Sequence, residues 1–147
     1  MYKRLLVPLD GSPLAEAALS HAEGLAHQFG SEIVLLRVVV SPYAIVAPDL
    51  VLAGTDSNHQ QFADQAEQYL KGVAGKLAAR NVKARIIACE GPVAEAILDR
   101  AKENQIDLIV MSTHGRGGVS RWVYGSVADR VLQTAPCPVL LIRLAGG

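Results

Sequence analysis

Short apolar, β-branched runs alternate along this chain with stretches whose apolar residues recur at helical spacing. This alternation restricts the fold most, because strands that alternate with helices form a parallel sheet with right-handed crossovers. The expected strands cover residues 3–9, 33–40, 82–89, 106–111 and 138–143. The second run is apolar on both faces apart from Arg37, which is typical of a parallel strand covered by helices on both sides. We therefore predict an α/β fold built on one open sheet.

The helices are predicted from their start and stop signals as well as from their apolar stripes. Ser12 is expected to cap the first helix, with Pro13 at its first position and Gly30 at its end. Further helices are expected over residues 57–80, from Gly91-Pro92 to about residue 101, and over 127–134. Residues 41–55 are expected to form a variable excursion without chemistry. No internal repeat is visible, and the length predicts a single domain over residues 1–147.

Composition excludes several classes of function. The net charge is zero and no basic stripe is present, so we expect no nucleic-acid partner. Asp10 ends the first apolar run too early for a signal peptide, and Arg37 interrupts the longest one, so no membrane span is expected. Cys89 and Cys137 form no C-x-x-C pair and are predicted to be buried, reduced residues of a cytoplasmic protein.

Residues 106–131 carry most of the functional signal. An apolar strand is followed by the small-residue loop 112–118, and Gly125-Ser126 are then expected to open a helix. Glycines allow the backbone to approach a ligand closely, and a helix start offers unpaired N–H groups to an anion. The segment therefore predicts a phosphate cradle, although the glycines are also compatible with a simple tight turn.

Two familiar nucleotide motifs are absent. No G-x-x-x-x-G-K-[ST] sequence occurs, which excludes a Walker-type P-loop. A dinucleotide motif that includes Gly115 and Gly117 would need another glycine at the position of Ser120. A nucleotide would have to be held by a different arrangement.

That arrangement resembles the G-x2-G-x9-G-[ST] signature of the universal stress protein family. Gly115, the nine residues 116–124 and Gly125-Ser126 match it, whereas Ser112 stands at the signature's first glycine. The resemblance covers nearly the whole chain, and its other landmarks are Val7 to Ser12, Glu90-Gly91-Pro92, Asp107 to Gly115 and Pro136 to Ile142.

The resemblance implies an adenine-nucleotide-binding, Rossmann-like fold with strand order 3-2-1-4-5 and helices on both faces. That order has a switch point between the first and fourth strands, where open α/β sheets bind ligands. Residues 8–11 and 111–115 should then face each other across one crevice. The implied ligand-contacting positions are Pro8, Leu9, Asp10, Val38, Met111, Ser112, His114, Gly115, Arg116, Gly118, Gly125, Ser126 and Val127.

The chemistry of single residues suggests their roles in ligand binding, and each of these residues could instead have a purely structural role. Asp10 suits ribose hydroxyls or a Mg²⁺ ion held through water, or else it stabilises the dipole of the following helix. Ser126 suits a phosphate, or else it is a plain N-cap. No nucleophile with an orienting partner accompanies His114, so no catalytic residue is predicted. The other histidines lack metal-ligand spacing.

The leading hypothesis is a cytoplasmic, homodimeric regulatory module of the stress response that binds ATP or AMP without fast turnover. Residues 139–142 form an apolar final strand at a sheet edge, and the resemblance implies that two such edges pair. One alternative is a nucleotide-independent interaction module in which Ser112 and a filled crevice prevent binding. Another is an enzyme such as an ATP pyrophosphatase, but Asp10-Gly11-Ser12-Pro13 does not supply the Ser-Gly-Gly-x-Asp-Ser-like loop which that class needs.

Overall fold

The computed structural model describes residues 1–39, 56–113 and 118–143, and strands alternate with helices throughout them. The predicted excursion at 41–55 lies outside these residues. The elements in chain order are β1 (Arg4–Pro8), α1 (Pro13–Phe29), β2 (Glu32–Val39), α4 (Asp56–Ala79), β3 (Ala84–Glu90), α5 (Val93–Glu103), β4 (Leu108–Ser112), α6 (Gly118–Thr134) and β5 (Val139–Ile142). The α/β prediction is confirmed.

The five strands form one sheet in the order β3-β2-β1-β4-β5, and every pairing is parallel. Leu6 at the centre of β1 pairs with Val34 on one side and Ile109 on the other. The predicted strand order is therefore confirmed. The direction of strand addition reverses at β1, so the carboxyl ends of β1 and β4 form the switch point.

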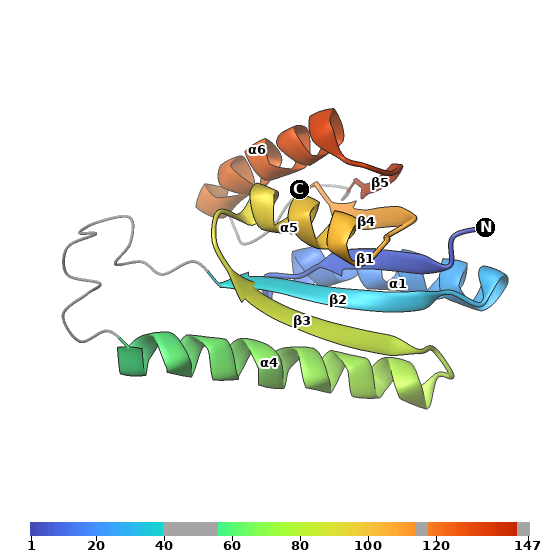
Figure 1. Cartoon of the computed structure of the whole chain (residues 1–147), viewed down its shortest axis with the longest axis horizontal. Coiled ribbons are helices and arrows are strands. Elements are labelled where there is room, and N and C mark those ends of the chain that lie inside the picture. The colour runs from blue at the N-terminus through green and yellow to red at the C-terminus, as the bar shows by residue number, and fades with distance from the viewer. Residues whose placement is uncertain (40–55, 114–117, 144–147) are drawn as a thin grey trace.

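Helices cover both faces of the sheet, with α4 below it and α5 and α6 above it in Figure 1. Alternate residues of each strand point to opposite faces. Leu35 thus packs in the cluster of α1 and α4, and its neighbour Leu36 in the cluster of α5 and α6. Both side chains are fully buried, and burying a leucine stabilises a fold by about 1.5–3 kcal/mol. The two clusters are the core.

Helix α1 begins and ends as its sequence predicts. The Ser12 Oγ accepts a hydrogen bond from the Ala15 N–H at 3.1 Å, and Pro13 occupies the first turn. Gly30 ends the helix with φ +67°, in the left-handed region that favours glycine.

The helix and strand bounds differ from the expected ones by a few residues in several places, and Cys89 and Cys137 are less buried than expected. Helix α6 begins at Gly118 and not at residue 127, because a single interior glycine costs only about 1 kcal/mol and the packing of the helix outweighs it. Strand β3 begins at Ala84 and not at residue 82, since Val82 is buried ahead of the strand. Cys89 and Cys137 are free thiols, but they are half-buried and not buried, because they pack at the margin of the α5–α6 cluster.

Within the described ranges, every helix is too short or too polar to cross a membrane.

Candidate functional site

The carboxyl ends of β1 and β4 lie side by side at one edge of the sheet, and each is followed by a helix. Pro8 ends β1 before α1, and Ser112 ends β4 before α6. The amino-terminal ends of both helices, which carry unpaired N–H groups and partial positive charge, therefore belong to this edge. Open parallel sheets bind ligands at such a place, and anionic ligands suit it.

The turn after β1 is tightly cross-linked. The backbone N–H and the hydroxyl of Ser12 both donate to Oδ1 of Asp10, at 2.9 and 2.5 Å, and Ser12 in turn caps α1. Gly11 between them has φ +88°, which a residue with a side chain rarely adopts. Asp10 thus has the structural role of holding the helix cap. The same bonds fix its carboxylate at the switch point, where a ligand role is chemically available.

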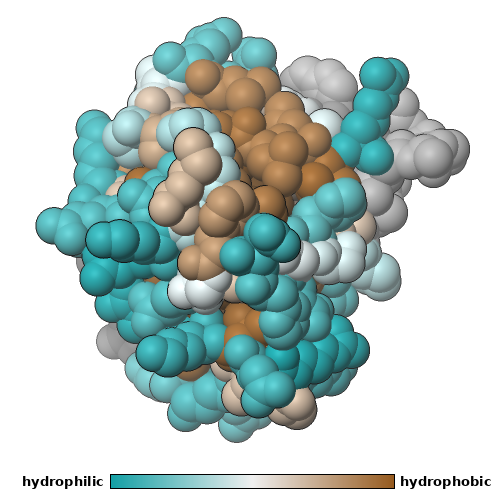
Figure 2. Space-filling view, turned by 90° about the vertical axis from the view of Figure 1, so that its right-hand side faces the viewer, coloured by the Kyte–Doolittle hydropathy of each residue, from teal (hydrophilic) through white to brown (hydrophobic). Residues whose placement is uncertain are grey.

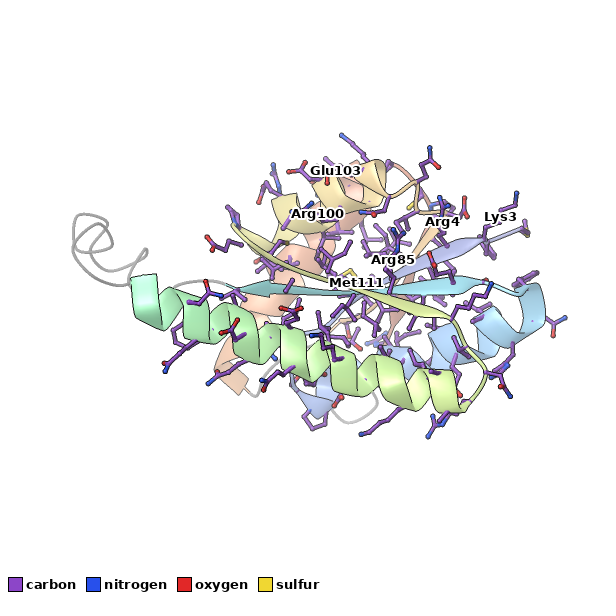
Figure 3. All side chains as sticks on the ribbon, turned by 60° about the horizontal axis from the view of Figure 1, so that its bottom comes forward. Lys3, Arg4, Arg85, Arg100, Glu103 and Met111 are labelled. Atoms are coloured by element: carbon purple, nitrogen blue, oxygen red, sulfur yellow. The ribbon has the colours of Figure 1, made fainter. Side chains whose placement is uncertain are left out.

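The apolar positions of the predicted site divide between the two faces of the sheet. Val38 and the fully buried Met111 pack with the α5–α6 cluster, and Figure 3 shows Met111 in the interior. Pro8 pairs with Leu36, which belongs to the same cluster. Leu9 packs instead with the α1–α4 cluster. The structure therefore gathers Pro8, Val38 and Met111 on one face and leaves the side chain of Leu9 on the other.

Ser112, which replaces the first glycine of the family signature, is fully buried. Its hydroxyl points at the carbonyl oxygen of Ala15 in α1, at 3.4 Å. The next residue, Thr113, donates its N–H to the Ile142 carbonyl oxygen at 3.0 Å. The bulk that serine adds is thus accommodated against α1.

The second half of the predicted phosphate cradle is placed differently from the expectation. Gly125 and Ser126 are exposed residues inside α6, and Val127 packs on the α5–α6 cluster. Because a helix rises 1.5 Å per residue, Gly125 lies roughly 10 Å along the axis from the helix start at Gly118. The prediction that Gly125-Ser126 open the helix is wrong. His114, Gly115 and Arg116 lie outside the described residues.

Among the described residues, no three histidine, cysteine, aspartate or glutamate side chains are grouped closely enough to hold a metal ion. A Mg²⁺ ion usually keeps several waters and binds through one or two carboxylates together with substrate phosphates. Asp10 fits that pattern and fits no all-protein cage.

A polar contact beside the Asp10 turn was not predicted as part of the site. Arg37 near the end of β2 lies so close to Gly11 that a Cβ there would be 2.8 Å from its Nη1 atom. The Arg37 Cζ atom also lies 5.1 Å from the ring centroid of Tyr69 in α4. A single charge inside an apolar strand was the sequence signal that could have found this contact.

Known proteins share both the sequence pattern and the fold. The profile of the Universal stress protein family matches residues 1–143. Universal stress protein MJ0531 of Methanocaldococcus jannaschii is 33% identical over 144 residues, which cover 97% of this chain and 83% of the relative. Universal stress protein YxiE of Bacillus subtilis is 32% identical over 151 residues, which cover 97% of this chain and all of YxiE.

Solved structures share the fold. The structure of the protein MJ0577 superposes with a TM-score of 0.84 at 24% identity, covering 100% of this chain and 99% of that one. A universal stress protein in complex with cAMP superposes with a TM-score of 0.71 at 18% identity, covering 96% and 97%. The universal stress protein from Archaeoglobus fulgidus in complex with dAMP superposes with a TM-score of 0.67 at 19% identity, covering 96% and 98%. The chain therefore belongs to the universal stress protein family.

Proposed function

We propose that this protein is a regulatory module that binds ATP or AMP at the carboxyl ends of β1 and β4. The observation that carries the proposal is the pairing of these two ends, with the braced Asp10 carboxylate at one and the start of α6 at the other. Two relatives of the same fold are complexes with the adenine nucleotides cAMP and dAMP, which supports the choice of ligand.

Each part of an adenine nucleotide has a chemically suitable partner at this edge. The Asp10 carboxylate would accept hydrogen bonds from ribose hydroxyls. The apolar surface of Pro8, Val38 and Met111 suits the adenine ring, and the start of α6 at Gly118 suits phosphates. Where Mg²⁺ accompanies ATP, Asp10 would bind the ion through a water molecule. The phosphate oxygens of ATP would bind it directly.

The proposed module does not turn ATP over rapidly, because the sequence shows no nucleophile with an orienting partner beside His114. Binding would act by shifting conformation or the choice of protein partner in the stress response. We place the protein in the cytoplasm, in agreement with its free thiols. Incubation with ATP and measurement of released phosphate should give a rate far below one turnover per second, the lower range of ordinary enzymes.

The primary test is to identify and measure the bound nucleotide. Protein purified without denaturation is treated with acid, and the released molecules are identified by mass spectrometry, with stoichiometric ATP or AMP expected. Calorimetry on emptied protein then gives the affinity, with and without Mg²⁺. Asp10→Asn keeps an oxygen for the Ser12 cap but loses the charge, and should weaken ATP binding about tenfold.

Asp107→Asn is the matched control for this experiment. Asp107 accepts the N–H groups of Lys3 and Arg4 at 2.8 and 2.9 Å, at the opposite edge of the sheet. Like Asp10→Asn, Asp107→Asn removes the charge of one carboxylate that accepts hydrogen bonds from backbone N–H groups. The Asp107→Asn protein should nevertheless bind ATP with the affinity of the wild type. Absence of binding to ATP and AMP at millimolar concentration would refute the proposal and leave a nucleotide-independent interaction module.

We further propose a homodimer that pairs the β5 edges (Val139–Ile142) of two chains. Strand β5 ends the sheet, and Leu140 on it is 37% exposed. Figure 2 shows apolar side chains gathered on the side where Figure 1 places β5 and the carboxyl end of α6. An exposed apolar edge strand is an aggregation hazard unless another chain covers it.

Sedimentation tests the dimer with two lysine substitutions. Leu140→Lys should shift the protein to monomer at micromolar concentration. Phe62→Lys on α4, where the phenylalanine is 39% exposed, changes charge and apolar area to a similar extent and should leave the dimer intact. A wild-type protein that sediments as a monomer would refute the dimer.

A further inference from the structure

The turn that carries Asp10 lies beside Arg37 of β2, on the face of the sheet that α1 and α4 cover. Arg37 follows Leu35 on β2 by two residues, so it points to the face that α1 and α4 cover. Its side chain is half-buried. On this face of β2 it is the one charged residue in a row that otherwise consists of Ile33, Leu35 and Val39.

One side of the Arg37 guanidinium is in contact with the turn. A Cβ placed on Gly11 would lie 2.8 Å from Nη1 and 3.4 Å from Cζ, so the guanidinium occupies the space that any side chain at position 11 would need. Gly11 itself has φ +88° and belongs to the most permissive residue type. The Ser12 hydrogen bonds hold the Asp10 carboxylate within the turn. Without a packed neighbour, a shift of the whole turn would still carry Asp10 with it.

The other side of the guanidinium lies over an aromatic ring. The Arg37 Cζ atom is 5.1 Å from the centroid of Tyr69, a distance typical of a cation–π contact. Tyr69 belongs to α4 and packs against the α1–α4 cluster, and this packing holds its ring in position. Arg37 is thus held between the ring and the turn.

The surroundings of Tyr69 include two carboxylates and the Arg37 guanidinium. Burial, followed by the nearby Glu16 carboxylate, raises the pKa of Tyr69 well above its ordinary value, and Asp10 contributes in the same sense while Arg37 opposes it. The Tyr69 hydroxyl is enclosed and has no hydrogen bond of acceptable geometry within the described residues. A guanidinium keeps its charge at any ordinary pH, so Arg37 places a permanent positive charge beside this ring.

Within the described residues, the ion pairs of β2 are formed by Glu32 at its amino end, and Arg37 takes part in none of them. Its position follows from the ring on one side and the glycine turn on the other. This geometry suits a residue that transmits the position of α4 to the turn.

We propose that Arg37 is a positioning residue, which uses Tyr69 as a support to hold the Gly11 turn so that the Asp10 carboxylate faces the ribose hydroxyls of the bound nucleotide. This inference rests on the proposed function. It adds that the preference for nucleotides with ribose hydroxyls over those without them depends on Arg37, a side chain that does not itself contact the ligand.

The test compares ATP with 2′,3′-dideoxy-ATP, which lacks both ribose hydroxyls, by calorimetry. Wild-type protein should bind ATP about tenfold more tightly than the dideoxy analogue, as expected for hydrogen bonds to one charged group. In Arg37→Met the ratio should fall to about one, because the side chain keeps its length but the turn is no longer fixed. Arg37→Lys should give an intermediate ratio, since an ammonium lacks the planar face that packs on the ring.

Arg85→Met is the matched control. Arg85 lies on β3 on the α5 side of the sheet, away from the carboxyl edge, with Nη2 3.3 Å from Oε1 of Glu32. The Arg85→Met substitution removes the same charge as Arg37→Met and should leave the ratio of the ATP and dideoxy-ATP affinities unchanged. Tyr69→Phe keeps the ring and should also keep the ratio, whereas Tyr69→Leu removes the support and should lower it.

The outcomes separate this inference from the proposed function. If the wild type binds neither nucleotide, the proposed function fails and this inference fails with it. If the wild type discriminates and a folded Arg37→Met keeps the full ratio, only the positioning role is overturned. An equal loss of affinity for both nucleotides would also overturn it, since a purely structural defect acts in that way. Should Arg37→Met not fold, Arg37→Lys and Tyr69→Leu decide by the same ratio.

Discussion

Arg37 and Val38 are neighbours in β2, yet they lie on two very different surfaces. Arg37 points to the α1–α4 face, where it meets a tyrosine ring and a glycine turn. Val38 points to the α5–α6 face, where its neighbours are apolar. The ligand edge of this sheet therefore has one side that fixes a polar turn and one side that offers an apolar surface.

Helix length accounts for much of this difference. Helix α4 has 24 residues and is about 36 Å long, so it passes the carboxyl ends of β2 and β3 in Figure 1. It can therefore enclose polar groups near that edge, such as the Tyr69 hydroxyl. Helix α5 has only 11 residues, about 16 Å, and covers a smaller part of its face. The longer helix, α4, supplies the Tyr69 ring on which Arg37 packs.

The largest expected effect tests whether both faces are equally well packed. Leu35→Ala removes a fully buried side chain from the α1–α4 cluster and Leu36→Ala removes one from the α5–α6 cluster. Each should lower the free energy of unfolding by about 2–5 kcal/mol, because a cavity adds to the lost transfer energy. Urea unfolding measures both, and a cost below about 1 kcal/mol for either would show that its face is loosely packed.

The next effect isolates the contact between the turn and Arg37. Gly11→Ala should cost about 1–3 kcal/mol of stability, most of it from its positive φ and a smaller part from displacing the guanidinium, which ends a flexible side chain. Gly30→Ala is the matched control, because it has φ +67° and open space around it, so it carries the backbone strain alone. The excess cost of Gly11→Ala should vanish in an Arg37→Met background, and its persistence there would contradict the contact.

A smaller effect concerns the enclosed Tyr69 hydroxyl. At pH 7, Tyr69→Phe should change the free energy of unfolding by less than about 1 kcal/mol, since it removes a polar group that has no hydrogen bond of acceptable geometry. The pKa of Tyr69 is raised in the folded state above its ordinary value of 10.0. The neutral form is therefore favoured by folding, and stability is fully present below pH 10 and is lost as the pH rises further.

Urea unfolding at pH 8 and above pH 10 checks this sign. The wild type should lose more stability over that interval than Tyr69→Phe. Burial also raises the pKa of the Cys137 thiol, which adds a loss of the same sign to both proteins and cancels in their difference. Equal losses in the two proteins would mean that the hydroxyl reaches solvent when it ionises.

The smallest effect comes from the two ion pairs that tie the helices of each face together. Arg80, the residue after α4, pairs with Glu23 of α1 at 3.0 Å between Nη1 and Oε2. Arg130 and Glu95 join α6 to α5 with 2.6 Å between Nε and Oε1. All but Glu23 are well exposed, so double-mutant cycles should give roughly 0.2–1 kcal/mol for each pair. Both values should shrink in 1 M salt. A pair that keeps its full value at high salt would be more buried in solution than its exposure suggests.

The sequence gives reliable boundaries where the signals are local. Ser12, Pro13 and Gly30 act on the backbone within a few residues of themselves, and α1 begins and ends as they predict. The start of α6 could not be obtained in this way. Gly125 is a local signal against a helix, but α6 packs on α5 and the sheet, and such packing is absent from a local pattern.

The candidate site shows the same division. Its location at the ends of β1 and β4 follows from the motifs and from the strand order that the family resemblance implies, and Asp10 lies there as expected. The separation of Leu9 from Val38 and the direction of the Ser112 hydroxyl toward α1 were not predicted. Both depend on which helix covers which face.

The sequence by itself determined the alternation of strands and helices along the chain and the cap of α1, because these depend on local backbone preferences and on periodicity. Only the tertiary structure decided that Arg37 meets Gly11 and Tyr69, three residues from a turn, a strand and a helix that are up to 58 positions apart. Strand periodicity shows that two neighbours point to opposite faces. What each of them meets is set by the crossover connections, which bring distant segments into contact.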